Sequence, residues 1–278
     1  SEFVKTRHIE KYFEPFVGGG AVFFWLSNEY KIKKAFLYDI NLEVITAYQA
    51  IRNNVFAVLR ELNKLENAYL DLPRFKRERF YYERREEYND FIAGSVKNHV
   101  VRRTALMIML NKTCFNGLFR VNSSGLFNVP FGRYENPTIC DEQNLLAVHE
   151  KLQNAEIECQ DFEYCVNKVD SKSLVYFDPP YRPISQTASF TGYIKNGFAD
   201  PEQIRLKKVC DKLSIRGAKV ILSNSDPQNV NPDDKFFDNL FKLKYRIDRL
   251  KATRMINCNA DRRGVIKEIL VRNYALKD

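Results

Sequence analysis

The stretch that most constrains the fold is residues 173–181, Ser-Leu-Val-Tyr-Phe-Asp-Pro-Pro-Tyr, where an apolar run ends in an acidic residue and two prolines. Residues 174–177 have the length and the β-branched or aromatic character of a buried strand. Because proline favours an extended residue before it, the strand is expected to end in a rigid, non-helical turn. Ligands of open α/β sheets bind beyond the carboxyl ends of the strands. We therefore expect Asp178 and Tyr181 to face a ligand crevice.

The composition is that of a folded protein with a basic balance of charge. The 278 residues are 45% apolar, and 44 Lys and Arg against 35 Asp and Glu give a net charge of +9, which favours a polyanionic partner. The 6 cysteines form no Cys-x-x-Cys pair and the 3 histidines lie far apart, so we expect reduced thiols and no metal site. No apolar run approaches the roughly 18 residues of a membrane span and no signal peptide opens the sequence, so a cytoplasmic protein is expected.

Strand and helix patterns alternate near both ends of the chain. A short strand leads into three glycines and an apolar helix from Ala21, and a strand at 35–38 precedes a helix at 42–52. A further helix opens at Asp200 with a first-turn proline. The remaining predicted strands are 155–159, 174–177, 219–222 and 266–274. This alternation predicts a mainly parallel sheet with helices on both faces.

The central part of the chain has a different character. It contains predicted helices, a segment dense in charge and tyrosine, and then a stretch rich in Asn, Gly, Phe and Arg. Short strands at 119–122 and 126–129 flank a Ser-Ser-Gly turn and predict a β-hairpin. We therefore assign residues 1–54 and 155–278 to one α/β domain and residues 55–154 to an inserted module.

The glycine turn at Gly18, Gly19 and Gly20 limits the choice of ligand. A dinucleotide fingerprint needs a further glycine where Phe23 stands, and a phosphate-binding Walker loop needs a Gly-Lys-Ser/Thr sequence that is absent. Asp39 ends the next strand, where an acidic side chain suits ribose hydroxyls. An adenosine-containing ligand without phosphates fits this pattern, and S-adenosylmethionine is one such ligand.

Three segments together carry a family resemblance. Phe-Glu-Pro-Phe-Val-Gly-Gly-Gly at 13–20, the hairpin segment at 111–134 and Asp-Pro-Pro-Tyr at 178–181 resemble, in sequence and in order, the Dam family of N6-adenine DNA methyltransferases that modify GATC. The resemblance implies a Rossmann-like S-adenosylmethionine-dependent methyltransferase sheet. It also implies that the inserted, mainly helical module with its hairpin recognises DNA, so that residues 1–54 and 155–278 form the catalytic, cofactor-binding domain.

The resemblance also assigns roles to individual residues of the catalytic domain. The catalytic residues implied are Asp178, Pro179, Pro180 and Tyr181. The cofactor-binding residues implied are Glu14, Pro15, Phe16, Gly18, Gly20, Asp39, Ile40, Asp161, Phe162 and Asp178. The chemistry agrees, because the adenine amine is a poor nucleophile until Asp178 and the Pro179 carbonyl accept its two hydrogens. Asp161 also has the sequence position of a helix N-cap, and the two roles are compatible.

For DNA, the resemblance places the contacts on the hairpin segment. The DNA-binding residues implied are Phe115, Asn116, Leu118, Arg120, Asn122, Pro130 and Arg133. The target amine is inaccessible inside a stacked duplex, so the base is expected to flip out while Phe115 and Asn116 fill the gap. An arginine such as Arg120 suits a guanine reader, because its two donors match the paired acceptors of guanine in the major groove.

The leading prediction is an S-adenosylmethionine-dependent methyltransferase that modifies N6 of adenine in double-stranded DNA, within GATC. One alternative is an RNA adenine methyltransferase, because Asp-Pro-Pro-Tyr also occurs in RNA methylases. Another is a sequence-specific DNA-binding protein without catalysis. The expected partners are double-stranded DNA and, for a restriction–modification role, an endonuclease that cuts the same site without binding the methylase. We expect a monomer with no membrane and no metal, associated with the nucleoid through DNA binding.

Overall fold

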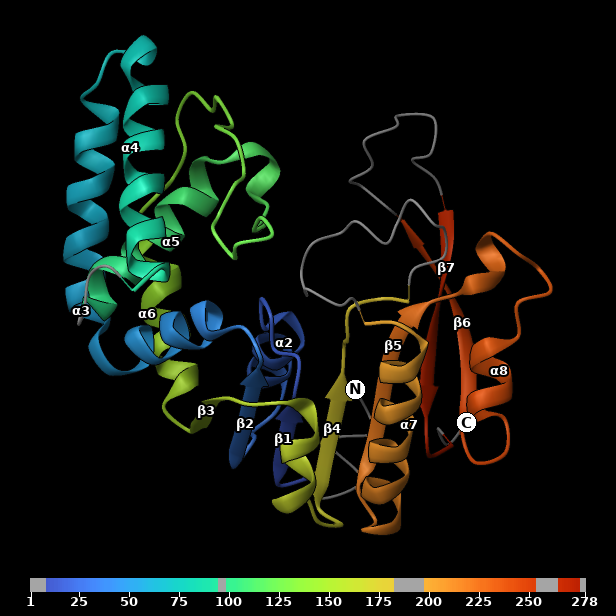
Figure 1. Ribbon diagram of the computed structural model, residues 1–278. Helices are drawn as coiled ribbons and strands as arrows, with labels where there is room; N and C mark the ends of the chain where they lie inside the picture. Colours follow the sequence, from blue (N-terminus) through green and yellow to red (C-terminus); the bar gives the residue numbers. More distant parts are fainter. Residues whose placement is uncertain (1–8, 95–98, 183–197, 254–264, 276–278) are drawn as a thin grey trace. The chain divides into compact units, whose positions relative to one another are not determined.

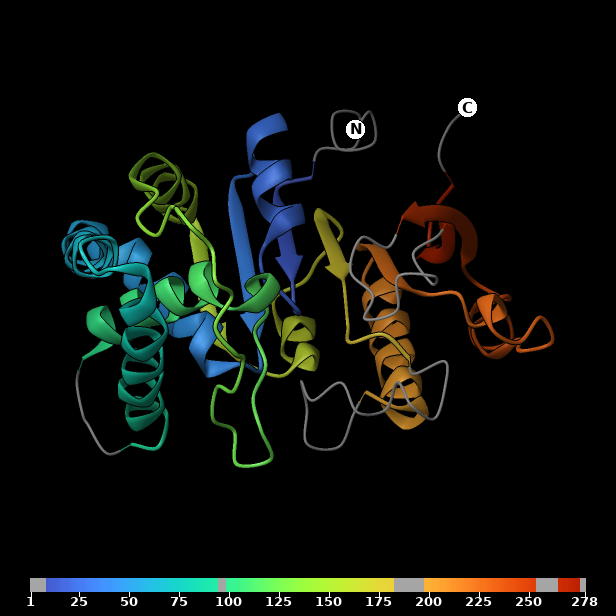
Figure 2. The same cartoon turned by 90° about the horizontal axis from the view of Figure 1, so that it is seen from above.

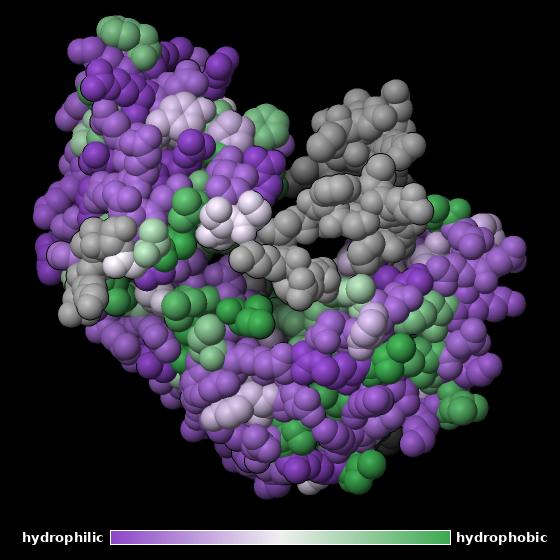
Figure 3. Space-filling view, viewed as in Figure 1, coloured by the Kyte–Doolittle hydropathy of each residue, from purple (hydrophilic) through white to green (hydrophobic). Residues whose placement is uncertain are grey.

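The computed structural model of the protein describes residues 9–94, 99–182, 198–253 and 265–275 (Figure 1). The chain forms two compact units, one made of Ser1–Ile40 with Asn154–Asp278 and the other of Asn41–Gln153. None of the helices in the described parts is both long and apolar enough to cross a membrane. The face seen in Figure 3 is mainly hydrophilic, with apolar side chains in small groups.

The first unit is built on a mixed sheet in the strand order β3-β2-β1-β4-β5-β7-β6. Its strands are β1 (Lys11–Glu14), β2 (Lys34–Asp39), β3 (Ala155–Cys159), β4 (Ser173–Phe177), β5 (Lys219–Ser225), β6 (Arg246–Thr253) and β7 (Val265–Arg272). The strands from β3 to β5 are parallel, and β7 runs antiparallel to both β5 and β6. The predicted α/β fold with a mainly parallel sheet is confirmed, and its last strand along the chain, β7, is reversed.

Helices cover both faces of this sheet. Its helices are α2 (Ala21–Glu29), η2 (Phe162–Asn167), α7 (Asp200–Ile215), η4 (Pro227–Asn229) and α8 (Phe236–Phe241). Tyr12 stacks on Phe23 of α2 with ring centroids 6.4 Å apart, whereas the adjacent Phe13 joins the buried core that contains Leu206 of α7. Successive side chains of a strand point to opposite faces, so α2 covers one face and α7 the other, as Figure 2 shows.

The second unit is mainly helical. Its helices are α3 (Leu42–Leu70), α4 (Arg74–Ile92), α5 (Val100–Thr113), η1 (Phe115–Gly117) and α6 (Glu142–Leu152). α3 is kinked at Asn54, where φ is −152°. Inside the unit, Glu43 accepts hydrogen bonds from Arg103 and from the hydroxyl of Tyr88, so a largely buried carboxylate has charged and neutral donors. Arg77 of α4 is likewise buried and donates to the carbonyl of Leu70, the last residue of α3, and to that of Leu72 in the following loop.

The boundary between the units differs from the predicted one at residue 55. The helix predicted at 42–52 continues through the kink to Leu70, and α3 packs along its length on α5 and α6. The first part of α3 therefore belongs with the helical unit, which begins at Asn41. The second predicted boundary, between residues 154 and 155, differs by one residue from the observed division.

The predicted hairpin is present only as isolated bridges. Val121 bridges Phe127 and Cys114 bridges Phe131, both antiparallel, without strands on either side. At the turn, Asn122 Oδ1 accepts hydrogen bonds from the amides of Ser124 and Leu126, each 3.0 Å long. The Asn122 side chain thus takes up backbone N–H groups at the turn. Such local hydrogen bonds compete with a regular ladder between strands, so the pairing here stays short.

Candidate active site

The Asp-Pro-Pro-Tyr turn lies at the carboxyl end of β4, as predicted from its sequence. The Asp178 side chain reaches solvent, yet the surrounding protein raises its pKa, and a hydrogen bond from Ser223 opposes this change. Ser223 Oγ donates to Asp178 Oδ1 at 2.7 Å. Burial also raises the pKa of Tyr181. The turn therefore presents a solvent-accessible carboxylate with a raised pKa together with a neutral phenol.

Residues that the sequence patterns did not reveal hold this turn in place. Arg182 follows Tyr181 and donates its amide to Asn224 Oδ1 at 3.1 Å. Its guanidinium binds Asp200 with Nε–Oδ1 2.5 Å and Asp234 with Nη1–Oδ2 2.7 Å, and it lies 4.3 Å from the ring centroid of Phe236. These partners lie far away along the chain, so no local spacing could have pointed to them. The exit of the Asp-Pro-Pro-Tyr turn is anchored by ion pairs.

The glycine turn lies after β1, the neighbour of β4 in the sheet. Gly18 and Gly20 have φ values of 45° and 67°, a backbone region that L side chains rarely adopt. The amide of Gly18 donates to Asp39 Oδ2 at 3.0 Å. A Cβ added at Gly18 or Gly19 would meet no heavy atom within 4 Å. The turn therefore leaves room for a ligand close to its backbone, and Asp39 helps to fix its shape.

Glu14 is a buried carboxylate at the end of β1. Its side chain is 3% exposed and accepts a 2.8 Å hydrogen bond from the hydroxyl of Tyr12. Burial raises the pKa of Glu14 to about 8, and the nearby Asp178 carboxylate adds to the effect, against the hydrogen bond from Tyr12. The group is thus protonated near neutral pH and could become ionised beside a cationic ligand.

Five of the predicted cofactor residues line one pocket of 380 Å³ in the first unit. Those five are Pro15, Phe16, Ile40, Asp161 and Phe162. The volume falls within the range of small-molecule sites. The other predicted cofactor residues, Glu14, Gly18, Gly20, Asp39 and Asp178, are not among its lining residues.

Aromatic rings and a charged side chain shape this pocket. Phe16 stacks on Phe162 with ring centroids 5.3 Å apart, and Phe198 contacts both rings edge-on. Arg205 of α7 makes two hydrogen bonds to Asp161, of 2.8 and 2.7 Å, and its guanidinium lies 3.9 Å from the ring centroid of Phe162. Asp161 also caps η2 through the amide of Glu163 at 2.9 Å, which confirms the predicted N-cap. The Arg205 guanidinium lowers the pKa of Asp161.

The predicted DNA-contacting residues lie in the second unit, around η1 and the bridges. Phe115 is 51% exposed, and Asn116 has φ 55° with its amide donating to the hydroxyl of Tyr134 at 3.0 Å. Arg120 is exposed, as is Arg133, which has φ 58°. Leu118 is half-buried, while Asn122 and Pro130 are exposed. Most of these side chains are therefore accessible at the surface of the unit.

Two hydrogen bonds to Asn128 fix the orientation of the Arg120 guanidinium on this surface. Its Nε donates to Asn128 Oδ1 at 2.8 Å and its Nη2 to the Asn128 carbonyl at 3.2 Å. Asn128 thus contacts one edge of the guanidinium. The remaining N–H groups point away from that edge, because the five donors of arginine lie in one plane in a fixed fork.

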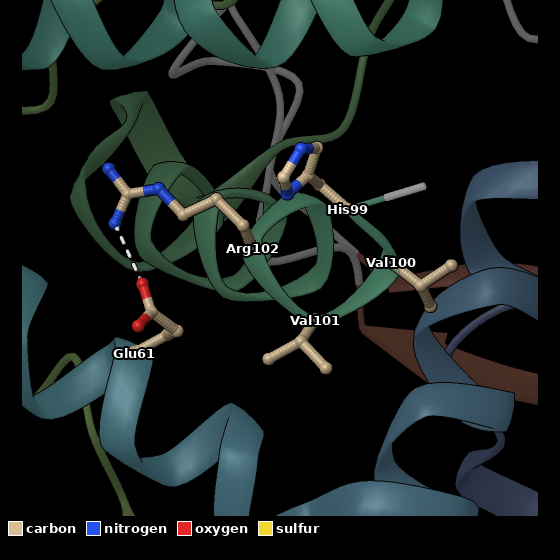
Figure 4. Close-up of a pocket in the computed structure, with 5 residues that line it drawn as sticks. All are labelled: Glu61, His99, Val100, Val101 and Arg102. Carbon is tan, nitrogen blue, oxygen red and sulfur yellow. Dashed lines mark hydrogen bonds and ion pairs between the residues drawn. The ribbon is translucent and has the colours of Figure 1, made fainter. Parts of the chain in front are cut away.

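A second pocket, of 510 Å³, lies in the helical unit (Figure 4). It is lined by Glu61, His99, Val100, Val101 and Arg102. Arg102 Nη1 lies 3.3 Å from Glu61 Oε2, so the charged groups of the pocket pair with each other. In the parts of the chain that the structure describes, no group of three His, Cys, Asp or Glu side chains is arranged to hold a metal ion.

The mostly parallel sheet with its reversed strand β7 has the fold of S-adenosylmethionine-dependent methyltransferases. Residues 1–256 match the sequence profile of a family described as D12 class N6 adenine-specific DNA methyltransferase. The chain belongs to this family and is an adenine-specific DNA methyltransferase.

Curated relatives agree with the family. The chain is 47% identical over 274 residues to the Type II methyltransferase M.MjaIII of Methanocaldococcus jannaschii. The aligned residues make up 98% of this chain and 91% of the relative. A Type II methyltransferase of Lactococcus lactis subsp. cremoris is 35% identical, over 98% of this chain and 89% of its own length. A DNA adenine methylase of Salmonella typhi is 33% identical, over 95% of this chain and 87% of its own length.

Proposed function

We propose that this enzyme transfers a methyl group from S-adenosylmethionine to N6 of adenine in double-stranded DNA, within GATC. The observation that carries the proposal is the pairing of β1 with β4, in which Phe13 lies opposite Val175. This pairing brings the glycine turn after β1 and Asp178 after β4 to the same edge of the sheet. A cofactor site and a proton-accepting group are thus neighbours at the end where ligands of such sheets bind.

The residues of the first unit fit the cofactor. The aromatic pocket of 380 Å³ suits a flat adenine ring, and the open glycine turn with Asp39 beside it suits the ribose and the methionine part. Glu14 is buried beside this turn. When the positively charged amino group of the cofactor binds there, Glu14 can release its proton to solvent and pair with that charge as a carboxylate. S-adenosylmethionine would supply an electrophilic methyl group on its sulfonium. Phe162, supported by Arg205, would form the wall of the adenine pocket.

The catalytic work of the chain falls on the Asp-Pro-Pro-Tyr turn. Asp178 and the Pro179 carbonyl accept hydrogen bonds from the two N–H groups of the target amine, which makes its nitrogen lone pair available for bond formation, and one of the two protons leaves the nitrogen once it is methylated. Pro180 keeps the turn rigid, and Tyr181 stacks on the flipped base. Raising the pKa of Asp178 makes its carboxylate a stronger hydrogen-bond acceptor.

The second unit is proposed to recognise DNA. Phe115 and Asn116 form an exposed turn with a backbone held by Tyr134, and they would enter the space that the flipped adenine leaves. Arg120 would read guanine, with Leu118 and Pro130 against thymine and Asn122 and Arg133 near the backbone. The assignment of GATC follows from the Dam resemblance of this segment. The DNA adenine methylase among the relatives supports it.

The proposal extends to the setting of the enzyme. Two relatives are named Type II methyltransferases, which supports a role beside a restriction endonuclease that acts on the same sequence. A cytoplasmic monomer that meets its site on double-stranded DNA is the simplest form of such an enzyme.

Transfer of radiolabelled methyl from S-adenosylmethionine tests the proposal. Three matched duplexes are compared, one with GATC, one with a scrambled site and one with GATC already methylated on both strands. Label on the unmodified GATC duplex alone is expected, and Asp178→Ala should abolish it while DNA binding persists. Label on RNA but not on DNA would favour the RNA alternative. DNA binding without cofactor binding or transfer would favour a non-catalytic DNA-binding protein.

A further inference from the structure

A serine on the neighbouring strand lies directly beside the proposed catalytic carboxylate. β4 and β5 pair in parallel up to Phe177 opposite Leu222, so the next residues, Asp178 and Ser223, emerge side by side. Ser223 is 8% exposed, and its Oγ lies 2.7 Å from Asp178 Oδ1. The contact is thus built into the register of the sheet.

The direction of the hydrogen bonds around this serine follows from the proton that each hydroxyl carries. Tyr176 of β4 places its hydroxyl oxygen 3.0 Å from Ser223 Oγ. Ser223 has one proton, and a carboxylate at 2.7 Å is a stronger acceptor than the carbonyl of Phe177 at 3.4 Å. Ser223 therefore donates to Asp178, and Tyr176 donates to Ser223. The result is a directed chain from Tyr176 through Ser223 to Oδ1 of Asp178.

This chain distinguishes the two oxygens of the carboxylate. Oδ1 accepts from Ser223, whereas in the part of the chain that the structure describes no hydrogen bond to Oδ2 is seen. A carboxylate has two oxygens with acceptor capacity on each, so fixing Oδ1 sets the direction in which Oδ2 points. We propose that Ser223, oriented by Tyr176, is a positioning residue that turns Asp178 so that Oδ2 accepts a hydrogen bond from the target amine. This inference rests on the proposed function of Asp178.

The electrostatic surroundings of Asp178 agree with such a role. The titratable groups that face this cluster are Tyr12 and Glu14 on β1, Tyr176 on β4, Tyr181 in the turn and Glu268 on β7. Within the described ranges of the chain none of these groups is a cation, and the hydrogen bond that stabilises the negative charge of Asp178 comes from a hydroxyl. The hydrogen bond from Ser223 lowers the pKa of Asp178 against the effect of burial. Without it, protonation of Asp178 is expected to begin at a higher pH.

The test measures the single-turnover rate of methyl transfer as a function of pH. Ser223→Ala should lower the rate at neutral pH by about tenfold, the order expected for one hydrogen bond to a charged group. It should also shift the acidic limb of the profile to higher pH. The dissociation constants for S-adenosylmethionine and duplex DNA should stay unchanged, because the serine is buried, with 8% of its surface exposed. Ser223→Thr, which keeps the hydroxyl, should restore most of the rate.

Two further variants separate positioning from folding. Tyr176→Phe removes the hydroxyl that orients Ser223 and should give a smaller loss of rate in the same direction, even if Ser223→Ala folds poorly. Ser173→Ala is a matched control, because Ser173 is also buried and donates to an aspartate, Asp170, at 2.9 Å, but lies at the opposite end of β4. It should leave the pH profile unchanged.

The outcomes distinguish this inference from the proposed function. If Ser223→Ala and Tyr176→Phe keep the wild-type rate and acidic limb, the positioning role is refuted while adenine methylation stands. If Ser223→Thr is as slow as Ser223→Ala, the serine acts through packing and the role is also refuted. A wild-type enzyme that does not methylate adenine would instead overturn the proposed function itself.

Discussion

Replacing Glu14 by glutamine should remove a pH dependence from the stability of the first unit. The side chain is 3% exposed, and burial together with the neighbouring Asp178 raises its pKa from an ordinary 4.5 to about 8. In the absence of cofactor the folded protein therefore holds this proton at pH values where the unfolded chain has released it. Glutamine has nearly the same shape and cannot ionise.

The sign and size of the effect follow from proton linkage. Between pH 4.5 and about 8 the folded state binds one more proton at Glu14 than the unfolded state. The free energy of unfolding then decreases as pH rises, by about 1.4 kcal/mol per pH unit. This stabilisation is fully present below pH 4.5, the ordinary pKa of Glu14, and is lost as the pH rises through its pKa of about 8 in the folded protein. From about pH 5.5 to about pH 7 the expected loss is roughly 2 kcal/mol.

The fluorescence of Trp25 reports on the first unit, because Trp25 is the single tryptophan of the sequence and lies in α2. Urea unfolding followed by its fluorescence gives the free energy of unfolding of that unit at each pH. The quantity of interest is the difference between wild type and Glu14→Gln, in which the other titrating groups cancel. Glu10→Gln is a control: its difference from wild type should not change over this pH range, because hydrogen bonds and ion pairing with Lys33 and Lys172 lower the pKa of Glu10. Parallel pH curves for wild type and Glu14→Gln would refute the reasoning.

Four further predictions follow from the geometry. Cofactor binding that ionises Glu14 should release a proton near pH 7, measurable by calorimetry in buffers of different ionisation enthalpy, and Glu14→Gln should not release it. Asn128→Ala should lower the preference for guanine about fivefold, judged by methylation rates on GATC and on duplexes with guanine replaced, because Arg120 loses a hydrogen bond that orients it. Gly132→Ala should destabilise the second unit by about 1–3 kcal/mol in chemical unfolding, because its Cβ would lie 2.5 Å from the Cys114 carbonyl. DNA affinity should fall steeply with salt, and a flat salt dependence would argue against phosphate contacts.

The sequence predicted the elements whose signals are local. Strand β3 has the predicted limits, and β4 begins one residue before the predicted 174. An apolar run between turn residues is sufficient evidence for a buried parallel strand. The signals of the glycine turn and the Asp-Pro-Pro-Tyr turn are equally local, so the sequence alone locates both turns.

The sequence did not predict the edge strand β6. Its residues, Arg-Ile-Asp-Arg-Leu-Lys-Ala-Thr, are rich in charge and show no clear alternation. β6 pairs only with β7 among the described strands, so only part of its surface is buried. Arg249 from this strand pairs with Asp226 and Asp238. Ion pairs between segments distant in sequence leave no periodic signal.

The support of the site was hidden for the same reason. Arg182, Arg205 and Ser223 act on the predicted residues through contacts that span 18 to 52 positions of the chain. The packing of α7, β5 and the loop before α8 against the turns brings these residues together. The sequence thus identified the candidate groups of the site but not the side chains that fix their direction.

The insertion of one unit into the other has a consequence for the order of folding. β2 and β3 pair with Ala35 opposite Ala155, so the whole of Asn41–Gln153 lies in the loop that this pairing closes. Closing a long flexible loop costs entropy, whereas helices with local contacts form quickly. In the folded helical unit, Gln153 Nε2 reaches the carbonyl of Arg52 at 3.2 Å, so the loop is effectively short. The helical unit is therefore expected to fold first, as the chain is made, and to bring β3 within reach of β2.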